Sequence, residues 1–188
     1  MSVRDKIAPE APASAYDMGH AAEIEHLATF AVLVDNEPGV LHRVVGLFAA
    51  RGYNIESLTV AETDPGARTS RITIVTRGTP HVLSQIEAQL KKMVSARHVQ
   101  DVTRDPNGVE RELALVKVRV VGAQRVEAKM VADIFRASIV DTTTGGFIFE
   151  ITGATSKIDK FVGLMRPLGL IEVSRTGVLS IERGGEAV

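Results

Sequence analysis

The feature that most limits the fold is an order of strand-like and helix-like segments that occurs twice along the chain. In the first copy, apolar and β-branched runs bounded by turn residues predict strands, and apolar residues three and four positions apart predict helices. The first copy therefore has the order βαββαβ. Its strands are predicted at 27–34, 53–62, 70–77 and 97–104, and its helices at 38–51 and 80–94.

The second copy repeats this order with different residues. Arg175-Thr176-Gly177 interrupts its last segment, which is either one strand or a pair of strands. Two successive βαββαβ units predict an α+β protein of two tandem ferredoxin-like domains. The strands of the second copy are predicted at 112–121, 138–141, 147–152 and 171–181, and its helices at 124–136 and 156–166.

Three local patterns make sharper predictions. The strand at 53–62 changes the face on which its apolar residues fall, and a bulge near Glu56-Ser57 would account for the change. The strand at 112–121 is apolar on both faces, which predicts a central position in its sheet. The helix at 124–136 groups four apolar residues on one side, namely Met130, Val131, Ile134 and Phe135.

Turn and loop signals predict the domain boundaries. The segment Asp105-Pro106-Asn107-Gly108 is a strong loop signal between the two copies. The first residues contain acids and prolines and lack the apolar stretch of a signal peptide, so we expect a flexible tail there. The predicted division is a tail at 1–25, a first domain at 26–104, a linker at 105–109, a second domain at 110–184 and a short tail at 185–188.

Composition excludes several classes of protein. The chain has 188 residues, 45% hydrophobic and 24% charged, and a formal net charge of -1, which is typical of a globular protein without a basic surface for nucleic acid. It has no cysteine, which excludes disulfides and thiolate chemistry and fits a reducing compartment. No apolar run approaches the roughly 20 residues needed to cross a bilayer. These observations predict a cytoplasmic protein.

No catalytic residue or metal site is predicted. The five histidines lie far apart without a metal-ligand spacing, and the sequence has no nucleophile elbow, P-loop or dinucleotide fingerprint. Glu110 and Glu112 are interpreted as the solvated start of a strand rather than as a general acid and base. A ferredoxin-like sheet can also bind RNA through aromatic residues, but the strand at 70–77 has none.

The turn from Asn36 to Leu41 is the candidate binding site. A helix N-terminus offers backbone N–H groups without intrahelical partners, and Pro38 leaves those of Gly39, Val40 and Leu41 to hold a carboxylate. Gly39 has no Cβ, so a ligand can approach the backbone, and Asn36 adds an amide that both donates and accepts. These features fit the capture of a small zwitterion. They also fit an ordinary strand-to-helix turn.

Longer segments resemble a known family. Residues 35–44 resemble the ligand-binding turn of the ACT domain, a βαββαβ module that commonly senses amino acids. The stretch Gly46-Leu47-Phe48-Ala49-Ala50-Arg51-Gly52-Tyr53-Asn54-Ile55-Glu56-Ser57-Leu58-Thr59-Val60 resembles the regulatory small subunit of acetolactate synthase, also called acetohydroxyacid synthase. The segments 85–92, 110–118 and 174–177 resemble the same family in the expected order. The resemblance covers roughly residues 27–184.

The resemblance implies a noncatalytic subunit that activates the catalytic large subunit of acetolactate synthase and confers feedback inhibition by valine or another branched-chain amino acid. It implies no cofactor on this chain, and thiamine diphosphate, Mg and FAD on the catalytic partner. It also implies a homodimer with the effector between two ACT domains. The effector would then be held by Asn36, Gly39, Val40 and Leu41 of one chain and approached by Asn54 and Ile55 of the other.

A second interpretation stays open from the sequence. The chain could be a free-standing amino-acid sensor of the ACT type that acts on another metabolic or transcriptional partner. No helix-turn-helix segment is apparent, which disfavours a transcription factor.

Overall fold

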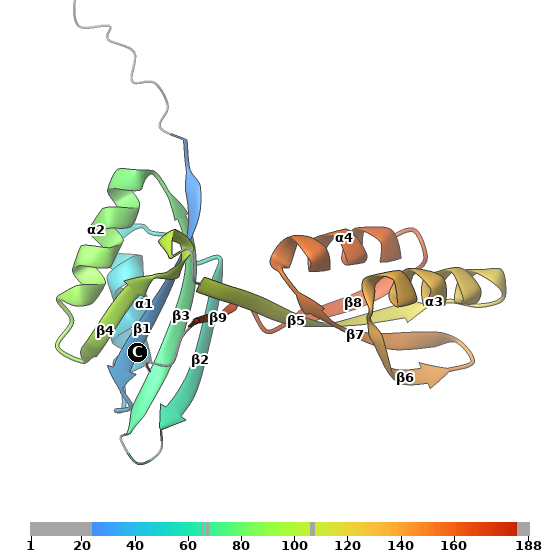
Figure 1. The fold of residues 1–188 in the computed structure, drawn as a ribbon, viewed down its shortest axis with the longest axis horizontal. Helices are drawn as coiled ribbons and strands as arrows, with labels where there is room; N and C mark the ends of the chain where they lie inside the picture. The colour runs from blue at the N-terminus through green and yellow to red at the C-terminus, as the bar shows by residue number, and fades with distance from the viewer. Residues whose placement is uncertain (1–23, 65, 67, 106–107, 184–188) are drawn as a thin grey trace, which may run out of the picture.

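The computed structural model describes residues 24–64, 66, 68–105 and 108–183. Two sheets, each covered by a pair of helices, lie side by side along the long axis of the molecule (Figure 1). The predicted α+β fold of two tandem βαββαβ domains is confirmed. The tail predicted at 1–25 lies outside the described residues except for its last two, and the tail predicted at 185–188 lies entirely outside them.

The first domain is an antiparallel sheet of four strands in the order β2-β3-β1-β4. The central strands pair Phe30 with Ile74 and Val32 with Ile72, and all four of these side chains are buried in the core beneath the helices. The elements are β1 (His26–Asp35), α1 (Val40–Arg51), β2 (Ser57–Asp64), β3 (Thr69–Gly78), α2 (Pro80–Lys91), β4 (Ala96–Asp101) and the short 3-10 helix η1 (Val102–Arg104).

The two helices of this domain begin and end where the sequence provides caps. Gly39 and Gly52 flank α1 with left-handed backbone angles, φ 85° and 69°, which glycine adopts at little cost. The Thr79 side chain accepts a hydrogen bond from the Val82 N–H at the start of α2, and Pro80 occupies the first helical turn. The buried residues recur at helical spacing, at Val40, Val44 and Phe48 in α1 and at Leu83, Ile86 and Leu90 in α2.

The predicted start of the second strand is wrong, because β2 begins at Ser57 rather than at Tyr53. Tyr53 instead closes α1: its N–H donates to the Phe48 carbonyl at 3.0 Å, and its ring meets the Phe48 ring edge-on. Ile55 packs half-buried against the core from this irregular segment. The apparent change of face therefore needs no bulge near Glu56-Ser57. The register irregularity of this strand lies at its other end, between Glu62 and Asp64.

The second domain has the strand order β6-β7-β5-β8, so the predicted central position of its first strand is confirmed. The helix predicted at 156–166 buries the apolar face expected of it through Ile158, Phe161 and Met165. The elements are β5 (Gly108–Arg119), α3 (Ala123–Phe135), β6 (Ser138–Thr143), β7 (Gly146–Gly153), α4 (Thr155–Met165), β8 (Leu170–Arg175) and β9 (Leu179–Glu182). None of these helices, and none of the others in the described part of the chain, is long and apolar enough to span a membrane.

Helix α3 does not bury the face that its apolar residues predict. Its fully buried residues are Ala128 and Ala132, and these small side chains let the helix approach its neighbours closely. Phe135 contributes by packing on Phe161 of α4, with ring centroids 5.5 Å apart. Met130 and Ile134, which belong to the predicted apolar side, are 59% and 71% exposed. Helical spacing thus located an apolar stripe, but close packing selected the alanine face beside it.

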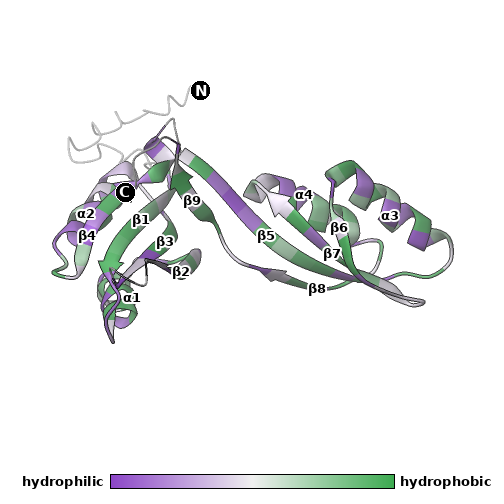
Figure 2. Cartoon of the chain, turned by 60° about the horizontal axis from the view of Figure 1, so that its bottom comes forward, coloured by the Kyte–Doolittle hydropathy of each residue, from purple (hydrophilic) through white to green (hydrophobic). Residues whose placement is uncertain are grey.

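Strand β5 belongs to both halves of the molecule. Its first residues, 108–111, pair with β9, and residues 112–119 pair with β7 and β8. Figure 2 shows β5 running from the first domain into the second, with β9 returning beside its start. Strand β9 therefore returns to the first domain, and the β8–β9 connection lies between the domains.

Candidate functional site

The strand-to-helix turn after β1 is held by backbone hydrogen bonds. The Asn36 N–H donates to the Arg68 carbonyl at 2.7 Å, and the Glu37 N–H donates to the Asp35 carbonyl at 2.9 Å. Gly39 has φ 85°, and open space surrounds the position where a side chain would begin. The turn therefore presents a fixed, accessible backbone at the N-terminus of α1, as the sequence predicts.

The three backbone donors expected in this turn are not equivalent. The Val40 N–H already donates to the Glu37 carbonyl at 3.2 Å, and the Val40 side chain is buried in the core. Gly39 and Leu41 flank it on the exposed side of the turn, and Leu41 is 40% exposed. A carboxylate approaching the helix N-terminus would therefore meet Gly39 and Leu41 first and would have to compete for the Val40 N–H.

The charges around the turn are arranged to suit both ends of a zwitterion. Asp35 receives a hydrogen bond from Arg97 Nε at 2.6 Å, and Glu37 forms an ion pair with Arg43, so both acids are neutralised. Glu62 on β2 instead accepts a hydrogen bond from the Asn36 amide at 3.2 Å. A carboxylate in this position can bind an ammonium group, while the helix N-terminus can bind a carboxylate. Sequence reasoning missed Glu62, because only strand pairing brings it beside Asn36.

Asn54 and Ile55 lie at the other end of β2. The Asn54 carbonyl accepts a hydrogen bond from Thr76 Oγ1 at 2.6 Å, and Asn54 lines a hollow of about 520 Å³. Asn36, in contrast, lies beside Glu62 near the opposite end of that strand. At about 3.4 Å per residue, the stretch from Ser57 to Glu62 spans roughly 17 Å. One chain therefore brings Asn36, Gly39, Val40 and Leu41 together, but does not bring them to Asn54 and Ile55.

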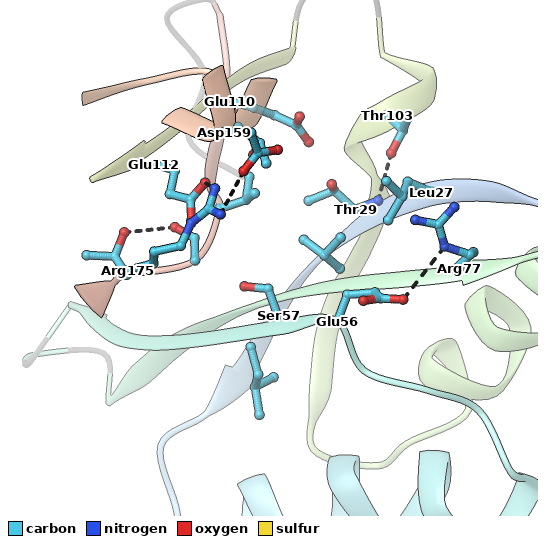
Figure 3. Close-up of a pocket in the computed structure, with 16 residues that line it drawn as sticks. Leu27, Thr29, Glu56, Ser57, Arg77, Thr103, Glu110, Glu112, Asp159 and Arg175 are labelled. Carbon is cyan, nitrogen blue, oxygen red and sulfur yellow. Dashed lines mark hydrogen bonds and ion pairs between the residues drawn. The ribbon is translucent and has the colours of Figure 1, made fainter. Parts of the chain in front are cut away.

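A second hollow, of about 690 Å³, lies between the two domains. Strands β1, β2 and β3 line it from the first domain, and β5, α4 and the end of β8 line it from the second (Figure 3). Its walls carry more acids than bases. The charged residues are Glu56, Arg77, Glu110, Glu112, Asp159 and Arg175.

Arg175 and Glu112 form a doubly hydrogen-bonded ion pair in this wall. The guanidinium donates from Nε and Nη2 to the two Glu112 carboxylate oxygens at 2.7 and 2.8 Å, and from Nη1 to Asp159 at 2.8 Å. The hydrogen-bonded Glu112 raises the pKa of Arg175 above its ordinary value, and Asp159 adds to this effect. The side chain of Glu112 is only 5% exposed, and Glu110 is half-buried. The interpretation of these two acids as a solvated start of a strand is therefore wrong.

The β8–β9 connection touches the first domain beside this hollow. Thr59 Oγ1 on β2 donates to the Thr176 carbonyl at 3.0 Å. Gly177 has φ 79°, and a side chain there would collide with Ser57 Oγ, also on β2. Sequence analysis identified Arg175-Thr176-Gly177 as an interruption between strands and as part of a segment with family resemblance, but predicted no contact for it. Its glycine was the one available signal of a close approach.

The fold and the turn together define a class of protein. An antiparallel βαββαβ domain with an open, glycine-containing turn before its first helix has the architecture of an ACT domain, and residues 30–96 match the family described as the acetohydroxyacid synthase small subunit-like ACT domain. Residues 111–184 match the family described as the small subunit of acetolactate synthase. The chain is therefore an ACT-domain protein with a second domain of a defined type.

Similar proteins cover nearly the whole of both domains. The chain is 45% identical to a probable acetolactate synthase small subunit of Archaeoglobus fulgidus, over 84% of this chain and 98% of that protein. It is also 45% identical to the acetolactate synthase isozyme 3 small subunit of Escherichia coli, over 81% and 93%. The crystal structure of the small subunit from Thermotoga maritima superposes with a TM-score of 0.76 at 38% identity, over 86% of this chain and 99% of that one. The chain belongs to the family of acetolactate synthase small subunits, and this membership supports a regulatory role.

Proposed function

We propose that this chain activates the catalytic large subunit of acetolactate synthase in the cytoplasm and makes it sensitive to inhibition by valine or another branched-chain amino acid. The large subunit would carry thiamine diphosphate, Mg and FAD, and this chain would supply no catalytic group. The observation that carries the proposal is the position of the predicted effector residues at opposite ends of an edge strand, in a chain that belongs to the small-subunit family.

A two-fold pairing of β2 with β2 of a second chain would complete the site. β2 lies at one edge of its sheet, next to β3. If two copies pair antiparallel through this edge, the start of one strand lies beside the end of the other. Asn54 and Ile55 of one chain would then approach Asn36 and Gly39 of its partner. The separation of roughly 17 Å within one chain thus becomes an argument for a site shared by two chains.

The chemistry of each half suits one part of an apolar amino acid. The N-terminus of α1 and the Asn36 amide would hold the carboxylate, and Glu62 would bind the ammonium group. The exposed side chain of Leu41 and the half-buried Ile55 would contact the branched side chain. A site shared by two chains can report occupancy only if the effector binds one dimer geometry more tightly, and about 1.4 kcal/mol of difference gives a tenfold effect.

Reconstitution tests the proposed function. Purified large subunit from the same organism should form acetolactate faster when this chain is added, and valine should then inhibit the mixture but not the large subunit alone. Leucine and isoleucine, titrated in parallel, identify the preferred effector. Failure of this chain to raise the rate or to confer inhibition would contradict the proposal. Binding of an amino acid without any effect on the large subunit would favour a free-standing sensor.

Placing lysine at Val60 should weaken the dimer. Val60 is near the middle of β2 and 44% exposed, so the proposed two-fold pairing would bring the two Val60→Lys side chains close together. Like charges facing each other across strands are destabilising, and we expect the dimer dissociation constant to rise about tenfold or more. Sedimentation equilibrium measures this constant. Val126→Lys, on the exposed face of α3, is the matched control and should leave it unchanged. An unaltered dimer in Val60→Lys would contradict the β2 interface.

A further inference from the structure

Side-chain and backbone contacts both hold the connection between β8 and β9 to the second domain. Arg175 is held by Glu112 and Asp159. The Thr176 N–H donates to the Leu113 carbonyl at 3.0 Å, and Thr176 Oγ1 accepts a hydrogen bond from the Leu113 N–H at 3.1 Å. Because Glu112 and Leu113 both belong to β5, any movement of that strand carries Thr176 with it.

The same connection also contacts β2 of the first domain. The Thr176 carbonyl accepts the hydrogen bond from Thr59, and a Cβ on Gly177 would collide with the Ser57 hydroxyl in its present rotamer. The ideal Cβ position of Gly177 is 3.5 Å from the Cβ of Ser57. This contact joins segments more than a hundred residues apart in the chain.

The segment that carries Asn54 and Ile55 leads directly into this contact. Ser57 is the first residue of β2 and follows Ile55 by two positions. The segment between them is tied to β3, because the Glu56 N–H donates to the Val75 carbonyl at 2.8 Å and Thr76 Oγ1 donates to the Asn54 carbonyl. Because these hydrogen bonds restrict the segment, a shift of Asn54 and Ile55 on effector binding would also displace Ser57.

Without this contact, the covalent connection between the domains would act as a pivot. The chain crosses between the domains through β5, and β9 returns only to pair with the start of β5. A ribbon of two strands, such as β5 with β9, can twist and bend. A further contact away from the axis of the ribbon would prevent the two domains from rotating relative to each other. Thr176 and Gly177 provide that further contact, with Ser57 and Thr59.

We propose that this contact, formed by Ser57 and Thr59 with Thr176 and Gly177, couples the effector site rigidly to the second domain. Occupancy at Asn54 and Ile55 would then reorient the second domain together with β2, and the second domain would convey inhibition to the catalytic subunit. The inference rests on the proposed function, since it presupposes an effector and a catalytic partner.

Gly177→Ala tests the coupling in the full-length chain reconstituted with the large subunit. The added methyl group meets Ser57 Oγ and Thr59 Oγ1, and alanine is strained at φ 79°, so the connection should shift away from β2. We expect valine binding, measured by calorimetry, to stay within about twofold of wild type, and activation of the large subunit to persist. The valine concentration for half-inhibition should rise about tenfold or more, because binding and response are uncoupled.

Gly122→Ala is the matched control for backbone strain. Gly122 has φ 56° and ψ -130°, a conformation that is also unfavourable for alanine, and lies in the second domain, but nothing is within 4 Å of its Cβ position. It should leave inhibition unchanged. Equal loss of inhibition in both variants, or unchanged inhibition in Gly177→Ala, would overturn the coupling. Absence of inhibition with the wild-type chain would instead refute the proposed function, so the two failures are distinguishable.

A reversible crosslink gives a second test. The 3.5 Å between the two Cβ positions lies within the range for a disulfide, and the chain has no cysteine to compete. The double variant Ser57→Cys/Gly177→Cys, oxidised before reconstitution, should retain half-inhibition within about twofold of wild type. Reduction should weaken inhibition as Gly177→Ala does. If the oxidised form binds valine but is no longer inhibited, the contact must open during signalling, and rigid coupling is overturned.

Discussion

Replacing Gly39 with aspartate should abolish inhibition by the effector while activation of the large subunit survives. Gly39 has φ 85° and open space around it, and aspartate tolerates this backbone region better than most side chains. Its carboxylate would lie at the N-terminus of α1, where it would both occupy the donors and repel the carboxylate of the effector. Two such charges about 4 Å apart cost roughly 4 kcal/mol near a protein surface, or about three orders of magnitude in affinity.

The effect of Gly39→Asp is measured by titrating valine against the reconstituted enzyme and by calorimetry on the isolated chain. Gly39→Asn is the matched control, because asparagine has nearly the same shape and backbone preference without the charge. It should weaken inhibition much less. Inhibition that persists in Gly39→Asp at wild-type valine concentrations would show that the turn before α1 is not the effector site.

Arg175→Met should produce the largest loss of stability among the substitutions considered. It leaves the Glu112 carboxylate, 5% exposed, without the guanidinium that donates two hydrogen bonds to it. Removing one partner of a buried ion pair typically costs 3–5 kcal/mol, and because Arg175 is itself 34% exposed we expect about 2–3 kcal/mol. For a protein of this size, the melting temperature should fall by roughly 5–10 °C, measured by calorimetry or circular dichroism.

Two further variants separate the buried interaction from the exposed one. Asp159 is the outer partner of Arg175, and the Asp159 side chain is 57% exposed. Asp159→Asn should therefore change the free energy of unfolding by less than about 1 kcal/mol. The double variant Glu112→Gln/Arg175→Met removes the buried charge and should recover part of the loss. An Arg175→Met protein as stable as wild type would show that solvent reaches Glu112 and replaces the guanidinium.

Most of the fold was predictable because periodicity is a local signal. Strands such as Thr69–Gly78 and helices such as Thr155–Met165 carry their pattern in successive residues, and each was located to within one residue or so of its ends. The errors arose where contacts distant in sequence decide the outcome. Met130 and Ile134 satisfy helical spacing, yet the face that packs is chosen by the fit of Ala128 and Ala132.

The candidate site also has a part that the sequence predicts and a part that depends on contacts distant in the chain. The turn from Asn36 to Leu41 is contiguous, so its helix N-terminus and its glycine were visible in the sequence. Glu62 reaches Asn36 only through the β2–β3 hairpin, and Glu112 becomes buried only because Arg175 arrives from a strand 63 positions later. No local pattern distinguishes such acids from solvated ones. The contact of Gly177 with Ser57 is likewise a product of domain arrangement.

The strand shared by the two sheets sets a rule for changes in chain length. Successive residues of β5 face opposite sides, and its buried residues alternate strictly at Ala114, Val116 and Val118. One residue inserted or deleted between Gly108 and Arg111 would turn the second domain over by about half a revolution relative to the first. Two residues would restore its orientation with a longer or shorter spacing. Relatives of different length should therefore carry their insertions and deletions in loops. Any change of length within this strand should be an even number of residues.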